Sequence, residues 1–202
     1  MSFINLDLSN EEIITKYFND LCCDDYTDPL IKGGQTYADN ALNSLDIQNY
    51  AKTRNNVLPT EKRGSTYLSP YIRHGLISLP EVWSFVEKFE YQDRTKFRDE
   101  LLWQEFSRHL YAIVGKNSRN YLNYSIKSNK NNQNNYQNMN CIESIKTELE
   151  STGYMVNQTR MWFASHFSLR DGNNWRNYED YMFKHLVDGS RFANRLGWQW
   201  VM

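Results

Sequence analysis

The stretch Asp188-Gly-Ser-Arg-Phe-Ala-Asn194-Arg-Leu-Gly-Trp198-Gln-Trp200 combines one amide with two tryptophans near the end of a 202-residue chain. If this stretch is helical, Asn194 and Trp198 lie four residues apart on one face. An amide both donates and accepts hydrogen bonds, and an indole ring is rich in electrons. Such a pair suits a redox-active aromatic cofactor, so we expect a helix here that faces a cofactor site.

Length and composition predict one domain without a membrane span. A chain of 202 residues is long enough to bury a substantial hydrophobic core, and we expect residues 1–202 to form a single domain. The mean hydropathy is −0.75, and no run approaches the ~20 apolar residues that a membrane helix needs. Because the net charge is only −1, binding to DNA would depend on a local basic patch.

The cysteines and histidines predict neither a disulfide framework nor a metal site. Three cysteines are an odd number, they lack metal-ligand spacing, and no secretory leader precedes them. The four histidines are scattered along the chain as well. We therefore expect no metal, and a location in the reducing cytoplasm. The residues concerned are Cys22, Cys23, Cys141, His74, His109, His166 and His185.

Helix signals dominate the sequence, and no alternating apolar and polar run is long enough for a strand. Two capping boxes, Ser9 with Glu12 and Ser78 with Glu81, start helices that run to about residues 21 and 89. Further helices are expected near residues 140–152, 154–168 and 177–188, separated by glycines. We therefore predict an all-α fold.

The segment from residue 93 to residue 139 contains the longest predicted helix and then a predicted loop. Asp93 is expected to cap this helix, and Gly115 to end it. Its apolar positions have helical spacing and are Phe97, Leu101, Phe106, Leu110 and Ile113. Residues 117–139 are rich in Asn and Gln and contain no Asp or Glu. Such a composition predicts a flexible loop, either a neutral insertion or a segment that orders on DNA.

Two further stretches add to the C-terminal one. Ser65-Thr66-Tyr67-Leu68-Ser69-Pro70-Tyr71 and Glu100-Leu101-Leu102-Trp103-Gln104-Glu105-Phe106, with residues 188–200, resemble the flavin-binding domain of the DNA photolyase and cryptochrome family. The resemblance covers roughly residues 33–200. It implies a truncated helical FAD-binding domain, without the family's N-terminal α/β antenna domain and the segments after Gly-Trp-Gln-Trp. The shortened pocket would then be open to solvent, covered by a partner chain or a second copy, or unable to hold the cofactor.

The resemblance implies an FAD site. Hydroxyls and backbone N–H groups at a helix start favour phosphate, although hydroxyls before a proline are more often simple caps or turns. In the family, the run at residues 65–69 binds the FAD pyrophosphate, an Arg and an Asp lie near the isoalloxazine ring, and an Asn faces flavin N5. Tyr67 replaces an arginine within that run, and Ser190 replaces the second aspartate of the family's Asp-Gly-Asp. The positions implied to bind FAD are Tyr50, Ser65, Thr66, Ser69, Arg160, Asp188 and Asn194.

Tryptophans are implied to carry electrons to the flavin. Trp198 and Trp175 match the proximal and middle members of the family's photoreducing tryptophan chain, although a buried indole is more often simple core packing. No tryptophan lies between Trp103 and Trp162, so the usual surface member is missing. The path would end at a tyrosine or at Trp162, or run poorly. The residues implied to act in catalysis are Glu100, Trp175, Asn194 and Trp198.

Five side chains match those that line the cyclobutane-dimer cavity of photolyases. Two indoles sandwich a flipped pyrimidine pair, a Met fills the apolar space, and a Glu and an Asn hydrogen-bond the base edges. These side chains are Glu100, Trp103, Asn157, Met161 and Trp200. Gln104 and Gln158 stand where the family has basic residues, which predicts weaker contact with DNA phosphates. Val156 replaces a His of the family, so repair of (6-4) lesions is not expected.

Three functions remain open at this point. The first is an enzyme that uses light and reduced FAD to transfer an electron to cyclobutane pyrimidine dimers, better in single-stranded than in duplex DNA. The second is a flavin photosensor of cryptochrome type without enzymatic activity. The third is an interaction module that keeps the fold but binds the cofactor poorly. A colourless protein that stays colourless with added FAD would favour the third.

Overall fold

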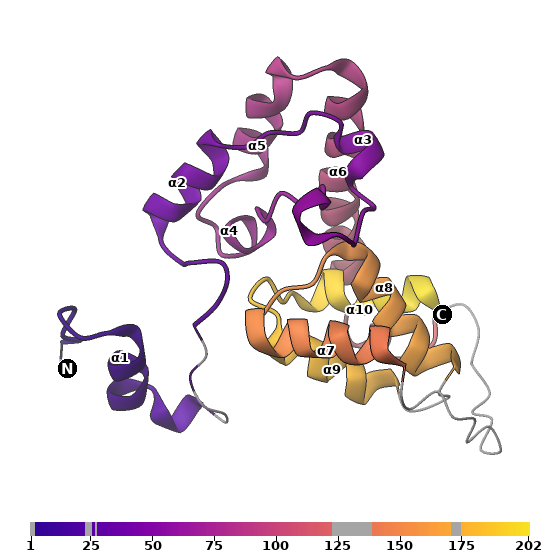
Figure 1. Cartoon of the computed structure of the whole chain (residues 1–202). Helices are drawn as coiled ribbons and strands as arrows, with labels where there is room; N and C mark the ends of the chain where they lie inside the picture. Colours follow the sequence, from indigo (N-terminus) through magenta and orange to yellow (C-terminus); the bar gives the residue numbers. More distant parts are fainter. Residues whose placement is uncertain (1–2, 23–25, 27, 123–138, 171–174) are drawn as a thin grey trace.

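Figure 1 shows the computed structural model of the chain, which describes residues 3–22, 26, 28–122, 139–170 and 175–202. These residues form helices joined by turns and extended segments, and no strand occurs among them. The predicted all-α fold is confirmed.

The helices between residues 35 and 114 form a first lobe with a hydrophobic core of its own. They are α2 (Gln35–Asn43), α3 (Tyr50–Thr53), η2 (Thr60–Lys62), α4 (Ser69–Arg73), α5 (Leu79–Phe85), η3 (Val86–Lys88) and α6 (Tyr91–Val114). The core includes Ala38, Ile47, Leu68, Val82 and Phe97. Ser78 caps α5 through a complete capping box with Glu81, as predicted. The helix then tightens into η3, earlier than the predicted end at residue 89.

A second lobe is built from the C-terminal helices. They are α7 (Asn140–Thr152), α8 (Asn157–Ser165), the π-helix η6 (His166–Arg170), α9 (Trp175–His185) and α10 (Arg191–Val201). Their apolar faces meet in a core that includes Leu149, Met155, Phe163, Trp175 and Trp198. The indoles that the sequence singled out as electron carriers are therefore also central packing residues of this lobe.

The N-terminal residues form a short helical arm. It consists of α1 (Asn10–Tyr17) and η1 (Asn19–Leu21), which together match the predicted helix to about residue 21. The capping box of Ser9 with Glu12 is formed as predicted. No residue of α1 or η1 is buried, and Figure 1 shows α1 apart from both lobes.

The prediction that Asp93 caps the long helix is wrong. Helix α6 begins two residues earlier, at Tyr91. The Asp93 carboxylate instead accepts hydrogen bonds from the backbone N–H groups of Asn49 (2.8 Å) and Ala51 (2.9 Å). It therefore satisfies free donors at the start of α3, which a helix N-terminus leaves unpaired. Gly115 ends α6 with φ 54°, as predicted.

The structure shifts two predicted helix starts. Gly153 takes a left-handed conformation (φ 69°) that ends α7, and residues 154–156 run extended, so the helix predicted from residue 154 begins at Asn157. The helix predicted at 177–188 spans Trp175–His185. Of the predicted loop at 117–139, the first residues belong to the 3-10 helix η4 (Gly115–Arg119). Residues 123–138 lie outside the described residues.

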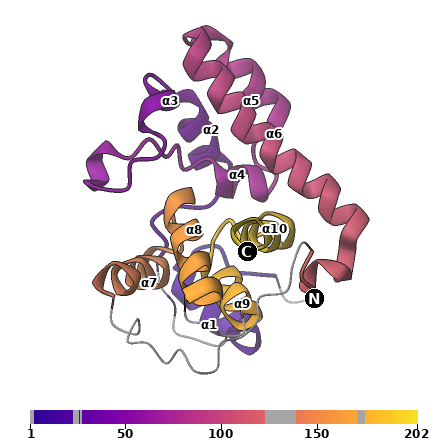
Figure 2. The same ribbon diagram turned by 90° about the vertical axis from the view of Figure 1, so that its right-hand side faces the viewer.

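The two lobes are joined by hydrogen bonds, an ion pair and helix packing. Arg73 Nε donates to the carbonyl of Gly189 (2.9 Å), and a His74 ring nitrogen lies 2.9 Å from the carbonyl of Val187. Arg63 forms an ion pair with Glu148 on α7. Helix α6 belongs to the first lobe and also packs on α10, and Figure 2 shows it as one long helix that continues past α10.

Within the described ranges, the protein has no helix with the length and apolar character that crossing a bilayer requires.

Candidate functional site

The segment before α4 brings three hydroxyl side chains to the junction of the lobes. A Cβ atom on Gly64 would lie 2.6 Å from backbone atoms at the end of α3, so only glycine lets the segment lie there. Tyr67 has a φ of 54°, a left-handed conformation that is unfavourable for a bulky residue and is concentrated at functional sites. Ser65, Thr66 and Ser69 are all partly buried beside it.

Tyr154 connects this segment to the second lobe. Its hydroxyl lies 3.1 Å from Ser65 Oγ, and its ring lies 4.9 Å from the ring of Tyr67. Burial raises the pKa of the Tyr154 phenol, so it stays protonated at neutral pH. The hydroxyl of Ser69 is buried near this phenol and makes no well-formed hydrogen bond. A polar atom in that state is available to a ligand.

Arg160 on α8 and Asp188 before α10 form an ion pair. Arg160 Nη2 donates to both Asp188 oxygens, at 3.0 and 2.8 Å, while Nε donates to the carbonyl of Met155 at 2.8 Å. The guanidinium also lies 5.4 Å from the centre of the Tyr154 ring. The Asp188 side chain is almost fully buried and that of Arg160 is about one quarter exposed. The pair is thus fixed in the protein while part of the guanidinium remains accessible.

Asn194 on α10 is held by a carboxylate that the sequence did not single out. Its Nδ2 donates to the backbone carbonyl of Glu179 (2.9 Å) and to Glu179 Oε1 (2.8 Å). Glu179 Oε2 in turn accepts from Arg195 Nη2 (3.1 Å) and Nε (3.3 Å). The side chains of Glu179 and Arg195 are both buried. Because both amide hydrogens point to Glu179, Oδ1 is the polar atom of Asn194 that remains for a ligand.

Two buried indoles stand next to each other, and one of them, Trp198, follows Asn194 by about one turn of α10. The rings of Trp198 and Trp175 are nearly parallel, with centroids 6.4 Å apart. The ring of Tyr121 follows at 6.3 Å from Trp175, and the guanidinium of Arg176 lies over both of these rings. Trp162 is about half exposed on α8. A line of aromatic rings therefore runs from the core to the partly exposed Tyr121.

The residues predicted to contact substrate lie at the surface. The rings of Trp103 on α6 and Trp200 on α10 are in contact, with centroids 6.0 Å apart and a 56° tilt. They are 53% and 73% exposed, respectively, which is unusual for indoles side by side. Asn157 and Met161 are also exposed on α8, where Asn157 Nδ2 lies 3.8 Å from Met161 Sδ.

Glu100 lies on α6 between charged neighbours. Its Oε1 is 3.2 Å from Lys96 Nζ and 3.4 Å from Arg54 Nε, and the carboxylate is more than one third exposed. Tyr50 lies nearby, with its ring 5.1 Å from that of Phe97. Burial raises the pKa of Tyr50, and the charge of Glu100 adds to this effect. Tyr50 is therefore a neutral, partly buried phenol of the first lobe.

These residues form two surfaces that meet at α10. We call the buried or partly buried groups Arg160, Glu179, Asp188, Asn194 and Trp198 the cofactor wall. Tyr154 links this set to the hydroxyls of residues 65–69, because its ring lies near Arg160 and its hydroxyl near Ser65. The substrate face is the set of exposed or partly exposed side chains Glu100, Trp103, Asn157, Met161 and Trp200. Sequence reasoning missed Tyr154, Glu179 and Arg195. The position of Glu179, one helical turn after Trp175, was the only available signal.

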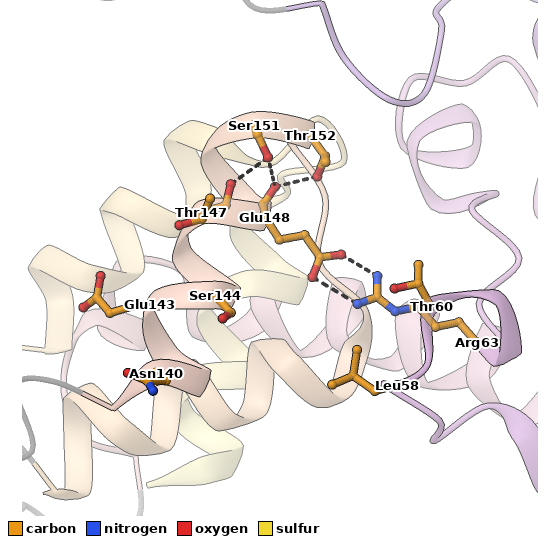
Figure 3. A pocket seen from close by; sticks show the side chains of 10 residues that line it. All are labelled: Leu58, Thr60, Arg63, Asn140, Glu143, Ser144, Thr147, Glu148, Ser151 and Thr152. Atoms are coloured by element: carbon orange, nitrogen blue, oxygen red, sulfur yellow. Dashed lines mark hydrogen bonds and ion pairs between the residues drawn. The ribbon is translucent and has the colours of Figure 1, made fainter.

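A groove of about 690 Å³ lies elsewhere, between α7 and the segment Leu58–Arg63 (Figure 3). None of the predicted site residues lines it. The hydroxyls of Ser151 and Thr152 donate to carbonyls of their own helix, and Arg63 is paired with Glu148. Because these four polar groups already have partners and no predicted site residue lies there, we do not assign the cofactor to this groove.

The junction of the lobes fits a flavin dinucleotide better. Besides Ser69 Oγ, the indole nitrogens of Trp175 and Trp198 are buried without a hydrogen-bond partner, and such polar atoms in a native structure call for a ligand or another explanation. Hydroxyl, guanidinium, carboxylate and amide groups are available for phosphate, ribose and ring. Among the described residues, no group of three or more His, Cys, Asp or Glu could hold a metal ion.

The chain is similar to known proteins of one family. The family model "FAD binding domain of DNA photolyase" matches residues 97–202. The deoxyribodipyrimidine photo-lyase of Vibrio cholerae is 28% identical over 169 residues, which cover 76% of this chain and 35% of that protein. The chloroplastic/mitochondrial cryptochrome DASH of Ostreococcus tauri is 27% identical over 201 residues, or 88% of this chain and 36% of that protein.

Solved structures share the fold. A class III photolyase from Agrobacterium tumefaciens superimposes with a TM-score of 0.72 at 23% identity, over 96% of this chain and 41% of that one. A Synechocystis cryptochrome gives a TM-score of 0.75 at 19% identity, over 90% and 42%. The family model covers just over half of the chain, so the chain belongs to the photolyase and cryptochrome family of FAD-binding domains. It spans well under half the length of these relatives.

Proposed function

We propose that this protein binds FAD and uses light to transfer an electron from reduced flavin to cyclobutane pyrimidine dimers in DNA. The observation that carries the proposal is the contact between two differently built surfaces on α10. Asn194 and Trp198 are buried in the cofactor wall, while Trp200, two residues later, is exposed beside Trp103. In such an arrangement, one helix presents buried residues to a cofactor and, within a few residues, an exposed indole to a stacked base.

Each group of the cofactor site has a role in this proposal. Ser65, Thr66 and Ser69 would hold the pyrophosphate, with Tyr50 on the same side. Arg160 and Asp188 would position the isoalloxazine ring, because their pair is fixed but partly accessible. Asn194 would offer Oδ1 to a donor on that ring. When bound, reduced flavin in its excited state supplies the electron, so no general acid, nucleophile or metal is needed from the chain.

The line of aromatic rings completes the proposed electron path. We propose that Tyr121, Trp175 and Trp198, in this order, relay electrons inward from the surface. The ring separations of 6.4 and 6.3 Å support this order. No described aromatic ring contact involves Trp162, which makes it a poorer end point than the tyrosine.

The substrate face supports binding of bases without strong binding of the duplex. Trp103 and Trp200 provide exposed ring faces, and stacking is worth about 1 to 3 kcal/mol per base. Their direct contact means that one indole must move before a base enters between them. Gln158 donates to Asn55 Oδ1 at 2.5 Å rather than providing a cation. Because extruding a dimer from a duplex costs a few kcal/mol that phosphate contacts normally offset, we propose single-stranded DNA as the better substrate.

Two observations favour a second candidate, a flavin photosensor or a binding module with a partner. The cryptochrome DASH relative aligns with 88% of this chain, and Trp200 is 73% exposed. A partner chain or a second copy of this chain would then cover Trp103 and Trp200.

The exposed free thiols of Cys22 and Cys141 fit the reducing cytoplasm that we propose for either function.

The test separates cofactor binding from repair. FAD is titrated first, and at 100 times its Kd it should stabilise the protein by about 2.7 kcal/mol. Protein loaded with pre-reduced FAD is then exposed to blue light with thymine dimers in matched single-stranded and duplex oligonucleotides. We expect faster loss of dimers from the single strand, and strongly reduced loss in Glu100→Ala. No thermal shift with FAD contradicts the flavin site, and FAD binding without any repair favours the photosensor.

A further inference from the structure

The Asn194 amide has only one orientation that its surroundings accept. Its two neighbours are the backbone carbonyl and the Oε1 of Glu179, at 2.9 and 2.8 Å. A carbonyl can only accept, and so can a carboxylate oxygen without a proton. A flipped amide would place its oxygen against both. The orientation therefore follows from the chemistry of the neighbours and not from the placement of the amide atoms alone.

This orientation depends on what holds the second oxygen of Glu179. If that carboxyl carried a proton, it could donate to Asn194, and only the backbone carbonyl would then oppose a flip of the amide. Arg195 donates to Oε2 with Nη2 at 3.1 Å and Nε at 3.3 Å, and Arg191 Nη1 lies at 3.5 Å. In this geometry both carboxylate oxygens act as acceptors. The two buried side chains of Glu179 and Arg195 make a charge-assisted pair shielded from water.

We propose that Arg195 is a positioning residue, which acts through Glu179 to hold the Asn194 amide with Oδ1 toward the cofactor. The inference rests on the proposed flavin site and deepens it. An acceptor fixed at this point favours a ring nitrogen that carries a hydrogen, as in reduced flavin, over the same nitrogen without one. Arg195 thereby makes the site selective for the redox state of its ligand, although the residue that contacts the ligand is its neighbour Asn194.

The first measurement needs no cofactor. Hydrogen exchange of the Asn194 side-chain amide is followed by NMR in 15N-labelled protein, with Asn194→Asp used to assign the signal. We expect exchange about tenfold faster in Arg195→Gln, because one strong hydrogen-bond partner no longer fixes the acceptor. Arg191→Gln is the matched control, since Arg191 pairs mainly with Asp180. In Arg191→Gln, exchange of the Asn194 side-chain amide should stay within about twofold of the native rate.

The second measurement concerns redox selectivity. The Kd values of oxidised and reduced FAD are compared in native protein, Arg195→Gln and the double variant Glu179→Gln with Arg195→Gln. The double variant leaves no unpaired buried charge, so it remains informative if the single variant does not fold. A Gln at 179 can donate as well as accept, so of the two neighbours only the backbone carbonyl still favours the native orientation of the amide. We expect the preference for reduced FAD to fall by about tenfold in both variants.

The outcomes are separable from those of the proposed function. If native protein binds no FAD in either state, the proposed function fails, and amide exchange alone decides whether Arg195 positions Asn194 through Glu179. Unchanged exchange in Arg195→Gln overturns the inference. FAD binding with the native ratio of Kd values in both variants also overturns it, even if the proposed function stands.

Discussion

The cofactor wall and the substrate face share α10, yet they are built in opposite ways. In the cofactor wall, Glu179 is fully buried and each of its oxygens accepts hydrogen bonds. On the substrate face, Glu100 is partly exposed between Lys96 and Arg54. Indoles differ in the same way, since Trp198 is 1% and Trp200 73% exposed.

The difference separates two kinds of binding. A wall of paired, buried groups is already in its final arrangement, so little ordering remains when a ligand arrives. A face of exposed side chains must still order its rotamers and move one indole. The cofactor wall is therefore coupled to the stability of the fold, while side chains of the substrate face can change with little effect on folding. The following experiments test this separation.

The largest contrast is expected between the two tryptophans of α10. Trp198→Ala should lower the free energy of unfolding by about 4 kcal/mol, because it leaves a cavity among Phe163, Trp175 and neighbouring core side chains. Trp200→Ala should change it by less than about 1 kcal/mol. Urea unfolding of both variants measures the difference. Equal losses would mean that Trp200 is covered in solution.

The next contrast concerns the charged groups. Asp188→Ala leaves the largely buried Arg160 without its partner, and we expect a loss of about 3 kcal/mol. The control Glu100→Ala removes a partly exposed carboxylate and should cost less than about 1 kcal/mol. FAD titration of the two proteins adds a second readout, because only Asp188→Ala should weaken binding. A strong loss of FAD affinity in Glu100→Ala would break the division between wall and face.

The rate of flavin photoreduction compares variants of the cofactor wall with a variant of the substrate face. With oxidised FAD bound, under blue light and external reductant, Trp198→Phe and Tyr121→Phe should slow reduction by about tenfold, equivalent to about 1.4 kcal/mol in the barrier. Trp103→Phe should leave the rate near that of the native protein, because Trp103 contacts Trp200 and Phe106 and not Trp198 or Trp175. A native rate in Tyr121→Phe would remove that tyrosine from the path.

The smallest effect is on pH dependence. Burial raises the pKa of Tyr154 in the folded protein, so the folded state holds this proton more tightly than the unfolded chain. Its contribution to stability is complete below the ordinary tyrosine pKa of about 10 and declines as the pH rises above it, by up to about 1.4 kcal/mol per unit. Tyr154→Phe should flatten that decline in urea unfolding between pH 9 and 11. An unchanged slope would exclude Tyr154 as its cause.

Sequence patterns predicted those elements whose signals are local. The capping boxes at Ser9 and Ser78 and the glycine ends at Gly115 and Gly153 need only a few neighbouring residues, and all four formed. The cap assigned to Asp93 failed because its carboxylate serves backbone donors more than 40 residues away. A tertiary contact of this length leaves no trace in local spacing.

The family resemblance selected candidate site residues but not the groups that hold them. Glu179 and Arg195 are 16 residues apart, and only the packing of α9 on α10 brings them together. Spacing also predicted apolar residues along all of α6 without showing where the buried face ends. Phe97 is 4% exposed, whereas Phe106 is 55% and Ile113 83% exposed. Burial along a long helix depends on what covers each turn, which a periodic pattern does not contain.

Helix α6 belongs to the core of the first lobe and packs on α10 of the second. Its 24 residues extend for about 36 Å, so neither lobe keeps all of its packing if this helix unfolds. Each lobe alone would expose apolar surface that the other now covers. Folding should therefore occur as one cooperative event, and the hydroxyls of residues 65–69 and the ion pair of Arg160 become ordered together or not at all.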